Sequence, residues 1–387
     1  MRRRPLAVAV MISIPAALMI GAALTADTGV TRVYYVAADE VDWNYLPMGE
    51  DALTGKPPGD GYRIFGIPDT IMALTMTKAV YREYTDSTFS AQKPRPPEWQ
   101  HLGLIGPVFR GEVGDTIVVV FKNHTRHPVS MHPHGVFYGK DSEGAPYSDG
   151  TTAKHDDGVP PGDTHRYLWP VPERAGPGPR QPNSIVWPYH SHTAEIEDVN
   201  AGLIGAMIIT RRGHADAEGR PTDVDREYVM MYGAQIENTT KYFKENMARY
   251  GVDTTTLGDI GPTPSSPPGP GSPFFQFFGY VSINGFLYAN LPLDDMTMDE
   301  GDRVRWYLFS STSFDDFHTP TWHGGTVLIN GRRTDVADLS GPLLMLTADM
   351  VADNPGTWQF HCHFGEHMEG GMTSLYRVRP KEPANRQ

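Results

Sequence analysis

The stretch Trp358-Gln359-Phe360-His361-Cys362-His363 contains the only cysteine of this 387-residue chain, and His367 and Met372 follow it closely. A lone cysteine cannot form a disulfide within the chain, so its thiol is free, paired with another chain or bound to a metal. The neighbouring residues are of types that bind metals. The stretch therefore predicts a metal centre.

The ligand types indicate which metal. Cys362, His367 and Met372, joined by His318 from further upstream, supply a thiolate, two imidazoles and a thioether. This is the ligand set of a blue-copper electron-transfer site. A single histidine or methionine is more often a packed or surface side chain, but so many ligand types in one short stretch do not coincide by chance. We expect a copper site of this type.

His361 and His363 predict a second metal site beside the first. Alternate side chains of a strand point to opposite faces, so both imidazoles lie on the face opposite Cys362. The chain offers more such imidazoles than one copper can use: His132 with His134, His190 with His192, His361 with His363, and His323. We expect a polynuclear copper cluster.

The chain also repeats itself. Gly114-Asp115 introduces a strand-like run before His132-Pro133-His134-Gly135, and Gly301-Asp302 introduces one before Thr321-Trp322-His323-Gly324. Trp187-Pro188-Tyr189-His190-Ser191-His192 likewise matches the stretch around Cys362. A repeat of about 170 residues is longer than solenoid or propeller periods, so it predicts two copies of one domain.

Length and composition favour the same architecture. The chain is long enough for two β domains of about 150 residues or more, and its 40 Gly and 34 Pro favour short strands joined by turns. We expect an all-β chain with domain 1 at 27–212, a polar linker at 213–225, domain 2 at 226–387 and an irregular exposed loop from Thr254 to Pro273. The formal net charge of −13 argues against a nucleic-acid partner, because phosphate binding needs clustered Lys and Arg.

Residues 1–26 predict export. Met1-Arg2-Arg3-Arg4 precedes an apolar run from Leu6 to Leu24 and small residues, which is the three-part form of a secretory signal. The run is nearly long enough to span a bilayer, so an uncleaved N-terminal membrane anchor is the alternative. Either way we expect a secreted or cell-envelope protein.

The four histidine motifs, in this order, resemble those of the multicopper oxidases, in particular the ceruloplasmin-like and two-domain laccase branch. The resemblance covers nearly the whole chain beyond the predicted signal and includes Gly106-Pro107-Val108, Lys140-Asp141-Ser142-Glu143-Gly144, Val171-Pro172-Glu173-Arg174-Ala175-Gly176-Pro177, Asn200-Ala201-Gly202-Leu203-Ile204-Gly205 and Ile283-Asn284-Gly285. It implies two cupredoxin-like Greek-key β-sandwich domains. It also implies a type 1 copper that takes single electrons from a small reducing substrate and a trinuclear cluster that reduces dioxygen to water.

Carried over residue by residue, the resemblance implies the copper ligands. The type 1 ligands would be His318, Cys362, His367 and Met372. The binuclear type 3 site would use His134, His190, His192, His323, His361 and His363, and the type 2 copper would use His132.

Two departures from the family pattern matter. Ser191, Ile196 and Leu203 occupy the cysteine, histidine and methionine positions of the first half, so only the second half can hold type 1 copper. This pattern resembles two-domain oxidases that assemble as head-to-tail homotrimers with each cluster between subunits, a closed heterologous ring. We expect a homotrimer.

The second departure is Thr321, which occupies the place of the second type 2 histidine and aligns with His132 in the repeat. A hydroxyl is a far poorer copper ligand than an imidazole, so we hypothesise a weakened or empty type 2 site. The alternative is that a water fills the position and activity survives.

Three further residues have candidate roles. Asp149 resembles the acid that supplies protons near the cluster, although it could be only a turn aspartate before glycine. Tyr138 could donate electrons near the type 2 position or be a core strand tyrosine. Glu366, beside His367, stands where ceruloplasmin-like ferroxidases carry an iron-binding acid, or is a solvated loop carboxylate.

The substrate stays open at this point. Gln276 and Val281 replace the glutamate and histidine that the ferroxidases use, so phenols or amines compete with ferrous or cuprous ions as reductants. A copper-binding or electron-transfer protein with little oxygen reduction is the non-catalytic alternative, which Thr321 favours. A copper nitrite reductase is rejected, because that family places type 1 copper in its first domain and lacks the type 3 pairs.

Overall fold

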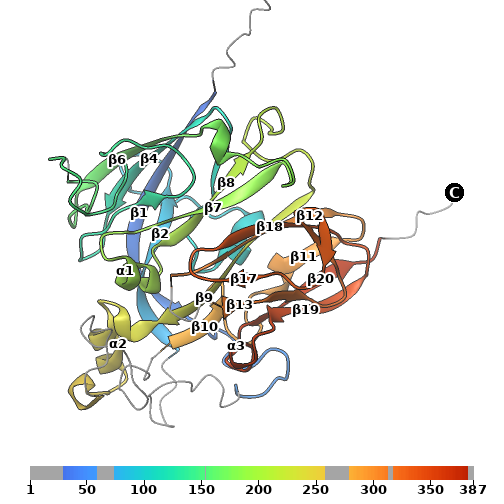
Figure 1. Ribbon diagram of the computed structural model, residues 1–387. Helices are drawn as coiled ribbons and strands as arrows, with labels where there is room; N and C mark the ends of the chain where they lie inside the picture. Colours follow the sequence, from blue (N-terminus) through green and yellow to red (C-terminus); the bar gives the residue numbers. More distant parts are fainter. Residues whose placement is uncertain (1–28, 59–73, 153, 258–278, 313–316, 382–387) are drawn as a thin grey trace, which may run out of the picture.

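The structure is a computed structural model that describes residues 29–58, 74–152, 154–257, 279–312 and 317–381. The predicted signal at 1–26, Gln276 and most of the predicted loop from Thr254 to Pro273 lie outside the described residues. Of that loop, Thr254–Leu257 form a 3-10 helix. Figure 1 shows the blue and green strands of the first half beside the orange and red strands of the second.

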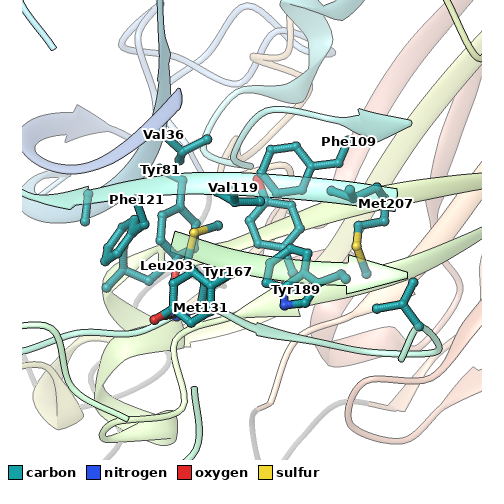
Figure 2. Close-up of a cluster of buried hydrophobic side chains, with 14 of the residues drawn as sticks. Val36, Tyr81, Phe109, Val119, Phe121, Met131, Tyr167, Tyr189, Leu203 and Met207 are labelled. Carbon is teal, nitrogen blue, oxygen red and sulfur yellow. Dashed lines mark hydrogen bonds between the residues drawn. The ribbon is translucent and has the colours of Figure 1, made fainter. Parts of the chain in front are cut away.

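Two four-stranded sheets form the first half. One has the order β2-β1-β4-β6, and the other has the order β3-β8-β7-β5. The strands are β1 (Thr31–Asn44), β2 (Thr75–Tyr84), β3 (Phe109–Glu112), β4 (Thr116–Asn123), β5 (His132–Pro133), β6 (Thr164–Pro170), β7 (Ser184–His190) and β8 (Ile204–Thr210). Figure 2 shows Tyr81, Phe109 and Tyr189 packed together in the core between these sheets.

The second half contains a six-stranded sheet of order β10-β9-β12-β18-β15-β16, a four-stranded sheet of order β11-β20-β19-β14 and the pair β13-β17. Its strands are β9 (Arg226–Ile236), β10 (Gly279–Ile283), β11 (Thr297–Asp299), β12 (Arg303–Ser310), β13 (Phe317–His318), β14 (Pro320–Trp322), β15 (Val327–Ile329), β16 (Arg332–Thr334), β17 (Leu339–Ser340), β18 (Met345–Val351), β19 (Gly356–Cys362) and β20 (Thr373–Arg379). The all-β prediction is confirmed.

The strand pairing repeats between the halves. β1 pairs in parallel with β4 as β9 does with β12, and β3 pairs in parallel with β8 as β11 does with β20. The antiparallel pair β5 and β7 corresponds to β14 and β19. The internal repeat read from the sequence is thus a repeat of topology.

The Gly-Asp turns before β4 and β12 explain part of this repeat. The Asp115 carboxylate accepts hydrogen bonds from Arg32 Nε at 2.7 Å and the Glu112 N–H at 2.9 Å. The Asp302 carboxylate accepts the equivalent bonds from Arg226 Nε at 2.8 Å and the Asp299 N–H at 2.9 Å. Each aspartate therefore ties the start of one strand to two others.

The helices are short: α1 (Glu195–Ala201), α2 (Phe243–Arg249), α3 (Gly365–Glu369), and 3-10 helices at Pro97–Leu102, Glu173–Ala175, Glu237–Thr239, Thr254–Leu257 and Leu293–Met296. α1 follows β7 and α3 follows β19, so each comes directly after a His-x-His strand. None of the helices in the described ranges is long and apolar enough to cross a membrane.

The two halves share a core. A cluster of buried side chains joins Val186, Ile204 and Ile208 of the first half to Val229, Tyr307 and Phe309 of the second. Nearby, the fully buried Lys78 ammonium donates to Glu237 Oε1 at 2.6 Å across the same boundary, and the Tyr45 hydroxyl donates to the same oxygen at 2.6 Å. The shared cluster buries one face of β8 and β12, and the core of each half buries the other face. Both strands therefore lack the alternating polar pattern of a half-exposed strand.

Candidate metal centres

The first candidate centre is a buried group of three side chains from different elements. His318 ends β13, Cys362 ends β19 and His367 lies in α3. Cys362 Sγ lies 4.0 Å from His318 Nδ1 and 3.8 Å from His367 Nδ1, and the two nitrogens are 3.2 Å apart. In the part of the chain that the structure describes, this is the one group of three His, Cys, Asp or Glu donors that all lie within 4.8 Å of one another.

These three donors fit copper. A metal with bonds of roughly 2.0–2.3 Å to imidazole and thiolate needs its donors about 3.5–4 Å apart. Burial acts to raise the pKa of the Cys362 thiol, but hydrogen bonds from His318, His367 and the Thr319 N–H outweigh it and lower that pKa to about 6. The sulfur is thus prepared as a thiolate, the form that binds metals.

Met372 is held at the same place by its backbone. Its carbonyl accepts the Cys362 N–H at 3.0 Å, its N–H donates to the His367 carbonyl at 2.9 Å, and its side chain is buried in the second-half core. The backbone of α3 and β20 thus brings all four predicted type 1 ligands into one region.

A second group consists of the four first-half histidines. His132 pairs with His190 in the register of β5 and β7. His134 Nε2 lies 3.1 Å from His190 Nε2, and the His132 ring centroid lies 5.1 Å from that of His192. The structure brings the four predicted imidazoles together.

Backbone carbonyls orient these rings. His132 Nδ1 lies 2.6 Å from the Glu143 carbonyl, and His190 Nδ1 lies 3.1 Å from the Ser191 carbonyl. Because a carbonyl only accepts, each Nδ1 carries the proton and each Nε2 keeps its lone pair for a metal. Such outer contacts fix the tautomer of metal-binding histidines.

A third group repeats this arrangement in the second half. His323 Nε2 lies 3.1 Å from His361 Nε2, and the His361 and His363 ring centroids are 5.2 Å apart. His361 Nδ1 donates to the Cys362 carbonyl at 2.9 Å, as His190 does to Ser191. The third group thus repeats the close imidazole pair and the carbonyl contact of the second, with three imidazoles instead of four.

Electrostatics keep several of these imidazoles neutral. Burial, and then the neighbouring imidazoles, lower the pKa of His134 to about 4. Burial is also the largest cause that lowers the pKa values of His132, His190 and His361. Neutral imidazoles are the form that ligates copper at neutral pH.

In the part of the chain that the structure describes, no hydrogen bond or ring contact joins the first-half imidazole group to the second-half one. Among the described residues, every hydrogen bond and ring contact between these histidines joins members of the same half. Each half thus presents a partial site.

Glycine makes room at both partial sites. Gly135 and Gly324 follow the first His-x-His segment of each half and have φ of +77° and +69°. A Cβ there would lie 2.4 Å from the Trp187 ring or 2.2 Å from the Trp358 ring. These close approaches account for the His-Gly steps in both motifs.

Thr321 occupies the structural place of His132. It pairs with His361 in the register as His132 pairs with His190. Its side chain is nearly buried, and its hydroxyl donates to the Thr319 carbonyl at 2.9 Å. The strand register thus gives Thr321 and His132 equivalent positions in the two halves.

The first-half counterpart of the Cys362 group contains no copper ligand set. Ser191 takes the place of Cys362, since its N–H donates to the Leu203 carbonyl at 3.1 Å as that of Cys362 does to Met372. The Ser191 hydroxyl donates to Asp198 Oδ2 at 2.7 Å, and Lys241 pairs with the other Asp198 oxygen at 2.9 Å.

The assignment of Ile196 to the histidine position is wrong. The Leu203 N–H donates to the Asp198 carbonyl at 3.0 Å, as the Met372 N–H does to that of His367, so Asp198 takes the histidine position. α1 is two residues longer than α3, with 7 residues against 5, which shifts the spacing. Ile196 is 38% exposed.

The three supporting residues differ in their surroundings. The Asp149 carboxylate accepts hydrogen bonds from Lys154 at 2.7 Å and from the Thr151 N–H at 2.9 Å, which hold its pKa well below the usual range. It is therefore an ionised turn aspartate, which disfavours proton donation. Glu366 is exposed in the first turn of α3.

Tyr138 lies beside the first-half histidines, with its ring centroid 5.7 Å from that of His132. It belongs to no strand and is 38% exposed, so the alternative of a core strand tyrosine is wrong. Burial raises the pKa of its hydroxyl.

Sequence reasoning missed two neighbours of the ligands. Glu195 Oε2 lies 3.3 Å from His192 Nε2, and the Phe364 ring centroid lies 5.0 Å from that of His367. Glu195 follows His192 by three residues at the start of a helix, and this spacing could have indicated the contact. Phe364 is 44% exposed and covers part of the His367 ring.

Comparisons with known proteins agree with this geometry. Two family models, each described as multicopper oxidase, match residues 101–214 and 275–382. The chain is 40% identical to human "Ferroxidase HEPHL1" and 37% identical to human "Ceruloplasmin", and each match covers 90% of this chain. It spans only 29% and 32% of those two relatives.

A solved structure titled "Crystal structure of multicopper oxidase" has the same fold. The TM-score is 0.54 at 18% identity, and the match covers 90% of this chain and 89% of that one.

Proposed function

The chain belongs to the multicopper oxidases, in the ceruloplasmin-like branch, and we propose that it oxidises a small reducing substrate and reduces dioxygen to water. One observation carries the proposal: β19 ends by pointing Cys362 into the buried three-ligand group while the preceding His361 belongs to the imidazole group. A single peptide bond therefore separates the two candidate centres.

We assign the type 1 ligands to His318, Cys362, His367 and Met372, and assign His134, His190, His192, His323, His361 and His363 to the type 3 pair. His132 is the proposed type 2 ligand. Copper, when bound, supplies the one-electron chemistry that joins oxidation of the reductant to reduction of dioxygen.

The residues around these ligands have separate tasks. Burial of His318, Cys362 and His367 excludes water from the type 1 donors, while the Phe364 ring lies on His367 at the surface. The carbonyls of Cys362 and Ser191 hold protons on Nδ1 of His361 and His190 and leave the opposite nitrogens free.

The reductant has two candidate classes. The exposed Phe364 beside His367 favours a phenol or aromatic amine, which can stack on the ring. The exposed carboxylate of Glu366, two residues later in the first turn of α3, favours ferrous or cuprous ions, in line with the ferroxidase relatives. Val281 packs against the second-half core and offers no ligand.

Oxygen uptake tests the proposal. The copper-loaded protein should consume oxygen with at least one of ferrous iron, cuprous copper or a phenol, and comparison of the three rates identifies the class. A stable blue absorption with no oxygen uptake from any of the three would instead support the electron-transfer alternative.

We also propose a homotrimer in which the first-half histidines of one subunit face the second-half histidines of the next. The two partial sites support this arrangement, because neither half alone supplies the full set of imidazoles. In a head-to-tail ring, both partial sites of every subunit face the complementary partial site of a neighbour.

The type 2 site is proposed to be weak. A neutral hydroxyl is a far poorer copper ligand than an imidazole, and Thr321 stands where the repeat would place one. Export to the cell exterior or envelope is proposed from the sequence of residues 1–26 alone, and cell fractionation tests it.

A further inference from the structure

A cavity of about 550 Å³ lies at the boundary of the two halves, and none of the proposed copper ligands lines it. β2, the segment from 92 to 103 and the second-half residues Phe286, Pro292 and Asp295 contribute to its walls. Its volume falls in the range of small-molecule sites. Nothing in the oxidase reaction requires it.

Two guanidinium groups in the wall form no ion pair with any carboxylate that the structure describes. Arg95 donates to the carbonyls of Gly103 at 3.0 Å and Ile105 at 2.7 Å, and Arg82 donates to the Tyr81 carbonyl at 3.2 Å. No carboxylate within the described ranges forms an ion pair with either group. A guanidinium has five N–H donors, so both keep free donors after these bonds.

The other cations of the cavity are already paired. Lys93 lies 2.8 Å from Glu83, Arg110 lies 2.6 Å from Glu227, and Arg220 lies 3.7 Å from Glu98. Arg82 and Arg95 are therefore the two cations of this cavity that form no ion pair among the described residues.

The surroundings make this charge unfavourable without an anion. Burial, followed by the charge of Arg82, lowers the pKa of Arg95 to about 10. Burial likewise lowers the pKa of Arg82, although Asp39 partly opposes it. A bound anion would give both groups a charge-assisted hydrogen bond, which neither forms with the described residues.

Aromatic side chains line the same cavity: Tyr34, Trp43, Tyr81, Trp99 and Phe286. The Trp43 and Phe286 ring centroids lie 5.1 Å apart with an edge-to-face tilt, and Trp43 is fixed by a 2.7 Å bond to the Gly285 carbonyl. Such walls favour a planar apolar ring.

Two acids in the wall limit the charge of the ligand. Glu218 and Asp295 line the cavity and form no ion pair among the described residues. They would repel a second negative charge, so a monoanion is preferred over a phosphate or dicarboxylate.

We propose that this cavity binds a small aromatic monocarboxylate, with its carboxylate on Arg82 and Arg95 and its ring against Trp43 and Phe286. The ligand would contact both halves of the chain at once. The site is independent of the proposed oxidase reaction.

Calorimetric titration of the full copper-loaded chain with benzoate and with benzamide, its neutral analogue, tests the proposal. Benzoate should bind at least tenfold more tightly than benzamide. Arg95→Gln and Arg82→Gln should each weaken benzoate binding about tenfold or more, because each removes a charge-assisted hydrogen bond, and should leave benzamide binding unchanged.

Arg220→Gln is the matched control, because this exposed arginine lines the same cavity but is paired with Glu98. It should change benzoate affinity less than twofold. The blue absorption of each variant reports whether it has folded. Equal binding of benzoate and benzamide, wild-type affinity in both arginine variants, or tighter binding of inorganic phosphate would each overturn the proposal.

Discussion

Cys362 contributes one atom to each of the two candidate centres. Its sulfur faces His318 and His367, while its carbonyl oxygen accepts the Nδ1 proton of His361 at 2.9 Å. The second contribution comes from the main chain, so it survives replacement of the side chain. The two centres can therefore be perturbed separately at one residue.

Cys362→Ser should abolish the blue absorption and lower the copper content by one atom per chain, because the thiolate is lost and the His361 contact is kept. Absorption spectra and metal analysis measure both. Ser191→Ala, at the equivalent first-half position, should leave the blue band intact. Loss of every copper in Cys362→Ser would contradict the assignment of separate centres.

Thr321→His should strengthen a type 2 copper signal in electron paramagnetic resonance and raise oxygen uptake, because it places an imidazole at the position that His132 has in the first half. Thr321→Val is the matched control and should show neither gain, because valine has the shape of threonine but adds no copper ligand. A stoichiometric, tightly bound type 2 copper in the wild-type protein would contradict the hypothesis of a weakened site.

At the scale of elements, the strands were predictable and the short helices were not. The run from Thr116 to Phe121 after the Gly114-Asp115 turn predicts a strand directly, and the observed strand is Thr116–Asn123. α1 and α3, with 7 and 5 residues, are too short to form alone and depend on tertiary contacts. That is why the sequence spacing placed Ile196, and not Asp198, in the histidine position.

Asp302→Ala should lower the free energy of unfolding by about 1–3 kcal/mol, because it removes the bonds from Arg226 and the Asp299 N–H that tie β12 to β9 and β11. Urea unfolding measures the change. Lys93→Ala, which removes an exposed pair with Glu83, should cost less than about 1 kcal/mol. Equal effects would show that the turn does not stabilise the fold.

At the scale of the molecule, the all-β, cupredoxin-like architecture expected from the sequence is confirmed, together with the multicopper oxidase family. The domain limits at 27–212 and 226–387 stay predictions, and so does the trimer. The sequence could not predict the buried pair of Lys78 and Glu237 or the arginine cavity. Both depend on which side chains two distant segments bring together.

Mixing two inactive variants tests the assembly. His190→Ala breaks the first-half partial site and His323→Ala breaks the second-half one. If clusters form between subunits, co-assembled chains contain some intact clusters and regain part of the oxygen uptake. Each variant alone should stay inactive, and no recovery in mixed trimers, verified by light scattering, would place the whole cluster within one chain.

The buried pair of Lys78 and Glu237 has a consequence for protein engineering and for evolution after duplication. The halves share one topology, yet they are not interchangeable modules. The first half carries the buried Lys78 ammonium and the second carries the buried Glu237 carboxylate, so each charge loses its partner when the halves are separated. Recombination with a homologous half would need both residues, or neither, to avoid a lone charge costing about 3–5 kcal/mol. Chimeras that inherit one member of the pair should therefore be recovered rarely from a shuffled library.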